Sequence, residues 1–175
     1  MKIYGYTIKS PIGNYNESEN FGAVIYKNDV CFAQISRNFD GKTSYITSKQ
    51  EDIRELIKLG SDLRDEHPEG IDGAFRYVGL GATSGIEAEE LFRGDEGALR
   101  FLENQIECLL TLQEIFEEEK GAVVIFVRKT ASPRTDTMSY AHLRPDNYSK
   151  QLKKIVANGG LITKIIETEE DLDVI

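Results

Sequence analysis

Residues 122–127 read AVVIFV, the most continuously apolar run in the chain. The fold prediction starts from this run, because it indicates which strand lies in the middle of the sheet. Apolar side chains on both faces are typical of a strand buried in the middle of a sheet. Gly121 precedes the run and marks the end of the element before it. We therefore expect a central strand at 122–127, with the other strands arranged around it.

The segments on either side of this strand differ in character. Upstream, apolar residues at helical spacing predict a long helix from Glu96 to Glu119. Downstream, residues 128–144 are polar and longer than an ordinary connection, so we expect an irregular loop. A helix from Pro145 to Ala157 and a strand at 161–166 follow. The buried stripe of the long helix is predicted at Leu99, Leu102, Ile106, Leu109, Leu110, Gln113 and Phe116.

The N-terminal part has the pattern of strands followed by a helix. Residues 2–9 alternate like a strand. Asn28 and Asp29 separate two apolar runs and tolerate positive φ, which predicts a β-hairpin. A helix is predicted at 49–65, where Ser48 and Glu51 have the spacing of a capping box. Weaker patterns predict short strands at 43–47 and 74–78 and a brief helix at 86–92.

This order of elements is neither strictly alternating nor all-β. We predict the α+β class: a single domain over residues 1–167 with a mixed β-sheet, an N-terminal hairpin and about three main helices. Residues 168–175 are predicted to be an acidic C-terminal tail.

The charge of the chain is strongly negative and unevenly distributed. Its formal net charge of −9 argues against general binding to nucleic acid, because phosphates would be repelled. The segment from Arg128 to Lys154 nevertheless carries seven basic and two acidic residues. Such asymmetry is typical of an anion site, of an acidic surface that meets a basic partner, or of a solvated helix face.

The apolar runs of the sequence predict its cellular compartment, and its two cysteines bear on metal binding. The first ten residues have no apolar signal-peptide run, and no stretch has about 18 consecutive apolar residues, so we expect a cytoplasmic protein without membrane contact. Cys31 and Cys108 are expected to be small core residues. Neither cysteine has histidines at metal-ligand spacing, so no metal is predicted.

A glycine-rich stretch at 79–85 raises the question of phosphate binding. Its glycines are spaced one residue too widely for the dinucleotide fingerprint. A P-loop is excluded because Ile86 and Glu87 stand where Lys and Ser or Thr are needed. Two interpretations remain open: a turn whose Ser84 caps the next helix, or a loop whose backbone N–H groups bind an anion.

Catalytic constellations are weak in this sequence. The two histidines, His67 and His142, do not form a pair at zinc-ligand spacing. Ser132, His142 and Asp136 supply the residue types of a triad, but no nucleophile elbow accompanies them. We therefore assign no catalytic residue, no metal and no cofactor.

The anion-binding candidates combine the glycine-rich loop with the basic segment, where arginine forks and ammonium groups suit phosphate or carboxylate. They are Gly79, Gly81, Thr83, Ser84, Gly85, Arg128, Lys129, Arg134, His142 and Arg144. The leading hypothesis is a non-catalytic binding or regulatory protein whose acidic surface engages a protein partner, as an inhibitor or a phage-type accessory protein would. The alternative is a small enzyme or sensor that binds a phosphorylated small molecule or nucleotide at these loops.

Overall fold

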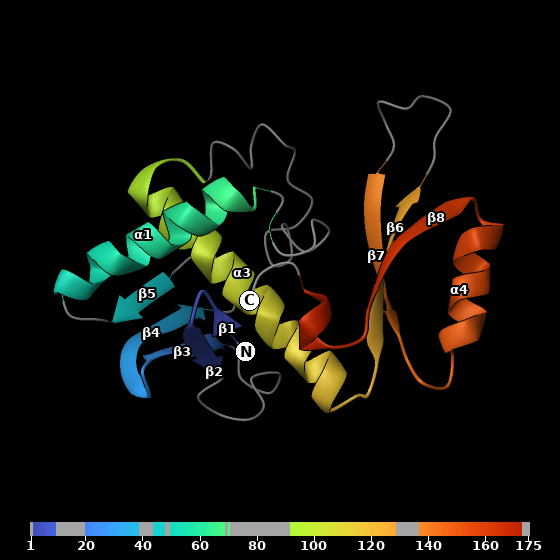
Figure 1. Ribbon diagram of the computed structural model, residues 1–175, viewed down its shortest axis with the longest axis horizontal. Coiled ribbons are helices and arrows are strands. Elements are labelled where there is room, and N and C mark those ends of the chain that lie inside the picture. Colours follow the sequence, from blue (N-terminus) through green and yellow to red (C-terminus); the bar gives the residue numbers. More distant parts are fainter. Residues whose placement is uncertain are drawn as a thin grey trace.

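The computed structural model describes residues 2–9, 20–38, 44–47, 50–68, 70, 92–128 and 137–172. Within these ranges the chain forms two sheets and three α-helices, which confirms the α+β class, the N-terminal hairpin and the three main helices (Figure 1). The prediction of a mixed sheet was wrong, because every strand pairing in these ranges is antiparallel. Most of the paired strands are neighbours in sequence, and antiparallel pairing needs no long crossover connection between them.

The first sheet is a meander of five strands in sequence order. The hairpin at Asn28 and Asp29 is confirmed, since both residues have positive φ (51° and 63°). The single strand predicted at 2–9 was wrong, because Tyr4 and Gly5 also have positive φ and turn the chain back on itself. The strands are β1 (Lys2–Ile3), β2 (Tyr6–Lys9), β3 (Asn20–Lys27), β4 (Val30–Asn38) and β5 (Ser44–Thr47).

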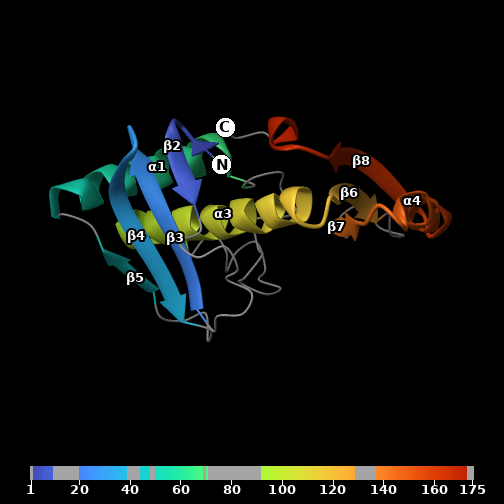
Figure 2. The same cartoon turned by 90° about the horizontal axis from the view of Figure 1, so that it is seen from below.

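Two helices, α1 (Gln50–Glu66) and α3 (Gly94–Glu117), contribute with this sheet to the main core (Figure 2). Their bounds lie within two residues of the predicted ones. The helices approach closely where Gly60 of α1 faces Ala98 of α3. Burial of α3 extends well beyond the predicted stripe and includes Phe101, Cys108, Leu112 and the polar residues 103–105.

The second sheet has the order β7–β6–β8, with α4 (Tyr148–Ala157) packed against it (Figure 1). The predicted central strand is confirmed as β6 (Ala122–Arg128), between β7 (Thr137–Leu143) and β8 (Gly160–Ile166). The prediction of one sheet around it was wrong, because the other five described strands form a separate sheet. Alternate side chains of β6 enter different cores. Val123 and Ile125 belong to the main core, whereas Ala122, Val124 and Phe126 form a smaller core with α4.

Part of the polar stretch predicted to be an irregular loop is strand β7, so that prediction was wrong for residues 137–143. The strand was missed because it lies at the sheet edge and its residues are only weakly apolar. Helix α4 begins at Tyr148 rather than Pro145. The preceding turn is closed by the backbone N–H of Arg144, which donates to Asn147 Oδ1 at 3.0 Å.

The C-terminal segment returns to the N-terminal strands. The short 3-10 helix η4 (Glu169–Asp171) is followed by Leu172, which is 5% exposed and belongs to the main core. The backbone N–H of Lys2 donates to Glu169 Oε1 at 3.2 Å. Residues 168–172 of the predicted acidic tail therefore pack as part of the fold.

Two further sequence predictions concern the burial of the two cysteines and membrane-spanning helices. Cys108 is buried as expected, but Cys31 is exposed, because it lies beside the hairpin turn at the start of β4. Across the described ranges, no helix combines the length and the apolar character needed to span a bilayer.

Candidate functional site

One face of α1 carries most of the ionisable groups of the candidate site. The residues on this face are spaced by three or four positions, which places them on one side of a helix. They are Glu55, Lys58, Leu59, Asp62 and Glu66. Three carboxylates and one ammonium group therefore line the same stripe, which makes it net negative.

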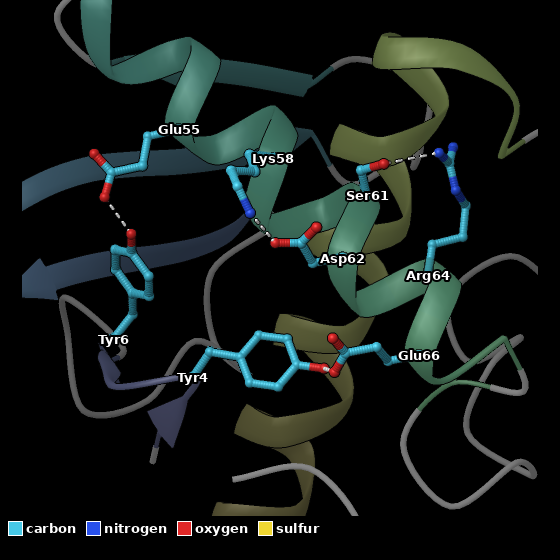
Figure 3. A network of polar contacts seen from close by, with 8 residues as sticks. All are labelled: Tyr4, Tyr6, Glu55, Lys58, Ser61, Asp62, Arg64 and Glu66. Carbon is cyan, nitrogen blue, oxygen red and sulfur yellow. Dashed lines mark hydrogen bonds and ion pairs between the residues drawn. The ribbon is translucent and has the colours of Figure 1, made fainter.

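The opposite wall is formed by two tyrosines at the β1–β2 turn. Tyr4 and Tyr6 point toward α1 from either side of this turn (Figure 3). Tyr4 has φ 47°, a left-handed conformation that costs about 1–2 kcal/mol for a residue with a side chain. Strained residues of this kind cluster at functional sites, where the surrounding structure holds them in place.

Hydrogen bonds connect the two walls. Tyr4 Oη donates to Glu66 Oε2 at 2.6 Å, and Tyr6 Oη donates to Glu55 Oε1 (Figure 3). Lys27 Nζ of β3 lies 2.6 Å from the same Glu55 oxygen. These contacts hold the carboxylates of Glu55 and Glu66 in defined positions at the hydroxyl ends of the tyrosine rings.

Burial and these contacts fix the protonation states. Burial, followed by the hydrogen bond to Glu55, raises the pKa of Tyr6 to about 12. Burial and the hydrogen bond to Glu66 raise the pKa of Tyr4 further still. The pKa of Glu55 is lowered, first by its hydrogen bond with Lys27 and then by that with Tyr6. At neutral pH the hydroxyls therefore donate, and Glu55 is ionised.

Between these walls lies an open groove of about 650 Å³, here called the acidic groove and lined by Tyr4, Tyr6, Glu55, Lys58, Leu59, Asp62 and Glu66. Lys58 Nζ lies 2.5 Å from Asp62 Oδ2, so this ion pair neutralises one of the three negative charges of the groove. Aromatic faces beside carboxylates suit a cationic group, because the ring quadrupole and the anions both attract positive charge. The arrangement favours recognition of ammonium or guanidinium groups.

The anion-binding residues predicted from sequence are only partly within the described ranges. Gly79, Gly81, Thr83, Ser84, Gly85, Lys129 and Arg134 lie outside them, so a joint site of the two loops stays a prediction. Arg128 pairs with Thr137, whereas Ala122 pairs with Leu143 at the other end of the β6–β7 ladder. Arg128 and Arg144 are therefore separated by about 20 Å along the ladder, given about 3.3 Å per residue. The structure does not bring these two arginines together.

His142 lies near the Arg144 end of this ladder, opposite Val123. Its Nε2 is 2.9 Å from Glu119 Oε2, just beyond the end of α3. Ser132 and Asp136, which would complete the triad weighed from sequence, lie outside the described ranges. For the part of the chain that is described, no three His, Cys, Asp or Glu side chains gather in a way that could hold a metal ion.

Sequence reasoning missed the acidic groove. Two signals were available: the 55–58–59–62–66 spacing of α1 and the glycine after Tyr4, which permits a tight turn. Neither signal says that the turn and the helix face each other. Comparisons of the chain with protein-family models, with curated proteins and with solved structures gave no match.

Proposed function

We propose that this chain is a non-catalytic, cytoplasmic binding or regulatory protein whose acidic groove holds a lysine- or arginine-rich segment of a protein partner. The groove itself carries the proposal, because it places two tyrosine rings beside three carboxylates. The net charge of −9 adds long-range attraction toward a basic partner. An inhibitor or phage-type accessory protein that covers the basic site of its target is one form of this function.

The acidic side chains can accept further hydrogen bonds in addition to those they already make. The hydrogen bonds described above use one oxygen of Glu55 and one of Glu66, and a carboxylate offers about four lone-pair sites. The existing bonds also restrain both side chains before a partner arrives. Restraint of this kind lowers the entropy lost on binding. Tyrosine adds contact area at low entropic cost and is enriched at protein interfaces.

The second hypothesis from sequence, an enzyme or sensor for a phosphorylated small molecule, has most of its proposed residues outside the described ranges. The carboxylates that line the acidic groove do not suit such a ligand, which would have to bind elsewhere on the chain. We therefore keep the binding of a basic segment as the proposed function.

The test is the binding of a short lysine-rich peptide, measured by calorimetry, with the same peptide acetylated on its lysines as the neutral comparison. Glu55→Gln, Asp62→Asn and Glu66→Gln together should weaken binding of the charged peptide by about tenfold or more and reduce its salt dependence. Binding of the acetylated peptide should be weak to every variant.

A matched control removes the same charge elsewhere. Glu117, Glu118 and Glu170 are exposed and lie outside the groove, so replacing all three with glutamine should change affinity much less. Equal losses in the two triple variants would mean that the peptide responds only to net charge, and the groove would no longer be the site.

A further inference from the structure

A second pocket lies between β6, β7 and α4, at the end of the small sheet where Arg128 is located. Its volume is about 190 Å³. Helix α4 and its C-cap residue Asn158 contribute residues at i, i+3, i+4 and i+7, which lie on one side of a helix. The pocket, here called the basic pocket, is lined by Phe126, Arg128, Tyr140, Ala141, Gln151, Lys154, Ile155, Asn158 and Gly160.

Close packing of α4 on β6 forms the floor of this pocket. Gly160 is paired with Arg128 in the sheet. A Cβ at Gly160 would lie 2.7 Å from Ile155 Cγ2 and 3.2 Å from Phe126 Cδ2, so glycine is required for this approach. The Arg128 guanidinium carbon lies 5.7 Å from the centre of the Phe126 ring. The charged fork is therefore held over an apolar floor.

The charge of the basic pocket is opposite to that of the whole chain. Arg128 and Lys154 contribute two positive charges, and no carboxylate is among the lining residues that the structure describes. Among the described residues, no Asp or Glu forms an ion pair with either of these two side chains. In a chain of net charge −9, a pocket of this composition requires an explanation.

We propose that the basic pocket binds the phosphate group of a phosphate monoester, independently of the acidic groove. A phosphate monoester carries about −1.5 to −2 charges at pH 7, which two cations match. Arginine offers a planar fork for two phosphate oxygens, and lysine adds a point charge. The side-chain amides of Gln151 and Asn158 supply further N–H donors.

The size of the pocket limits what it holds. Pockets for complete small-molecule ligands measure about 300–1,000 Å³. At about 190 Å³, this pocket has room for the phosphate and the adjoining carbon, while the rest of the ligand stays outside. The apolar walls at Phe126 and Ile155 suit that carbon.

The C-terminal end of helix α4 weakly disfavours the binding of an anion. Lys154 is in the last turn of α4, where the helix dipole is negative. At an exposed site this opposition amounts to less than about fivefold in affinity. Each charge-assisted hydrogen bond contributes about tenfold or more, so the two cations decide the outcome.

The test is a titration of the full chain, followed through its backbone amide resonances by NMR. The probes are inorganic phosphate, glycerol phosphate and a short peptide with one phosphoserine, each compared with chloride at matched ionic strength. Saturable shifts at Arg128, Asn158 and Gly160 are expected with the phosphate probes. Tighter binding of glycerol phosphate or of the phosphopeptide identifies a small molecule or a modified side chain as the source of the phosphate.

Matched variants show whether the pocket is responsible. Arg128→Gln and Lys154→Gln should each weaken phosphate binding by about tenfold. Lys150→Gln removes the same charge from the same helix outside the pocket and should leave affinity within about twofold. Arg128→Lys keeps the charge without the fork and should give an intermediate loss. Shifts that chloride reproduces, or equal losses in Lys150→Gln, would overturn the proposal.

Discussion

At the level of single residues, the tyrosine hydroxyls determine how the acidic groove is held together. Tyr6 donates to Glu55, which is also bound by Lys27, so three elements meet at one carboxylate. Tyr4 makes the equivalent bond to Glu66 from a left-handed backbone conformation. A strained aromatic residue is costly to keep in a turn where glycine or asparagine would be easier, which is consistent with a binding role.

The raised pKa of Tyr6 predicts a defined dependence of stability on pH. Because the pKa rises from about 10 in the unfolded chain to about 12 in the fold, the stability it contributes is complete below pH 10. This contribution is lost as pH rises from 10 to 12. Tyr6→Phe has no such proton, so the advantage of the parent, about 1 kcal/mol from the hydrogen bond at pH 8, should decline over that range.

Chemical denaturation at pH 8 to pH 12 measures the free energy of unfolding of both proteins. Titration of groups remote from Tyr6 affects parent and variant alike and therefore cancels in their difference. A difference that stays constant from pH 9 to pH 12 would contradict the assignment of Tyr6 as a half-buried donor to Glu55.

At the level of elements, local pattern was enough for some parts of the fold and not for others. Strand β6 was predictable because its side chains are apolar on both faces, and the 28–29 hairpin because Asn and Asp accept positive φ. Strand β7 was missed because an edge strand needs little apolar character of its own and is recognised by its pairing with β6. Pairing partners are set by the tertiary structure, which local periodicity does not encode.

The same reasoning explains the outcome for the candidate sites. The acidic groove joins residues 4 and 6 to residues 55–66, and the basic pocket joins Arg128 to Lys154. The charge excess between Arg128 and Lys154 was visible in the sequence. That Arg128 would meet Lys154 rather than Arg144 depends on the direction of β7 and the placement of α4.

The crossing of α1 and α3 gives a prediction at this scale. Alanine normally stabilises a helix by about 1 kcal/mol relative to glycine. At Gly60, however, a Cβ would lie 2.3 Å from the carbonyl oxygen of Ala98, and backbone cannot move aside cheaply. Gly60→Ala should therefore destabilise the protein by about 3 kcal/mol, because the helices must separate.

Gly5→Ala is the comparison for this prediction. Gly5 has φ +86°, and a Cβ there would meet nothing within 4 Å, so the expected cost is about 1 kcal/mol from backbone strain alone. Thermal and chemical unfolding measure both values. If Gly60→Ala proved as stable as the parent, the close approach of α1 to α3 would be wrong.

At the scale of the whole molecule, α3 runs from the first sheet toward the second, and the C-terminal segment closes the chain against the N-terminal strands (Figures 1 and 2). The Asp171 carboxylate accepts the backbone N–H groups of Glu167 and Thr168 at 2.9 and 3.0 Å. These two bonds are the main reason that the pKa of Asp171 is lowered. They hold the turn that directs Leu172 into the core.

Leu172 tests whether this closure belongs to the fold or is a loosely attached tail. The side chain is 5% exposed, so Leu172→Ala should cost about 2–3 kcal/mol through lost burial and the cavity left behind. Leu161→Ala removes the same atoms at a position that is 54% exposed and should cost less than about 0.5 kcal/mol. Urea unfolding of both variants gives the comparison. Leu172 is not among the described lining residues of either pocket. Its loss should therefore lower stability, while the affinity for a basic peptide, measured well below the midpoint of unfolding, stays unchanged. Equal small costs for both leucines would place residues 168–172 outside the cooperative fold.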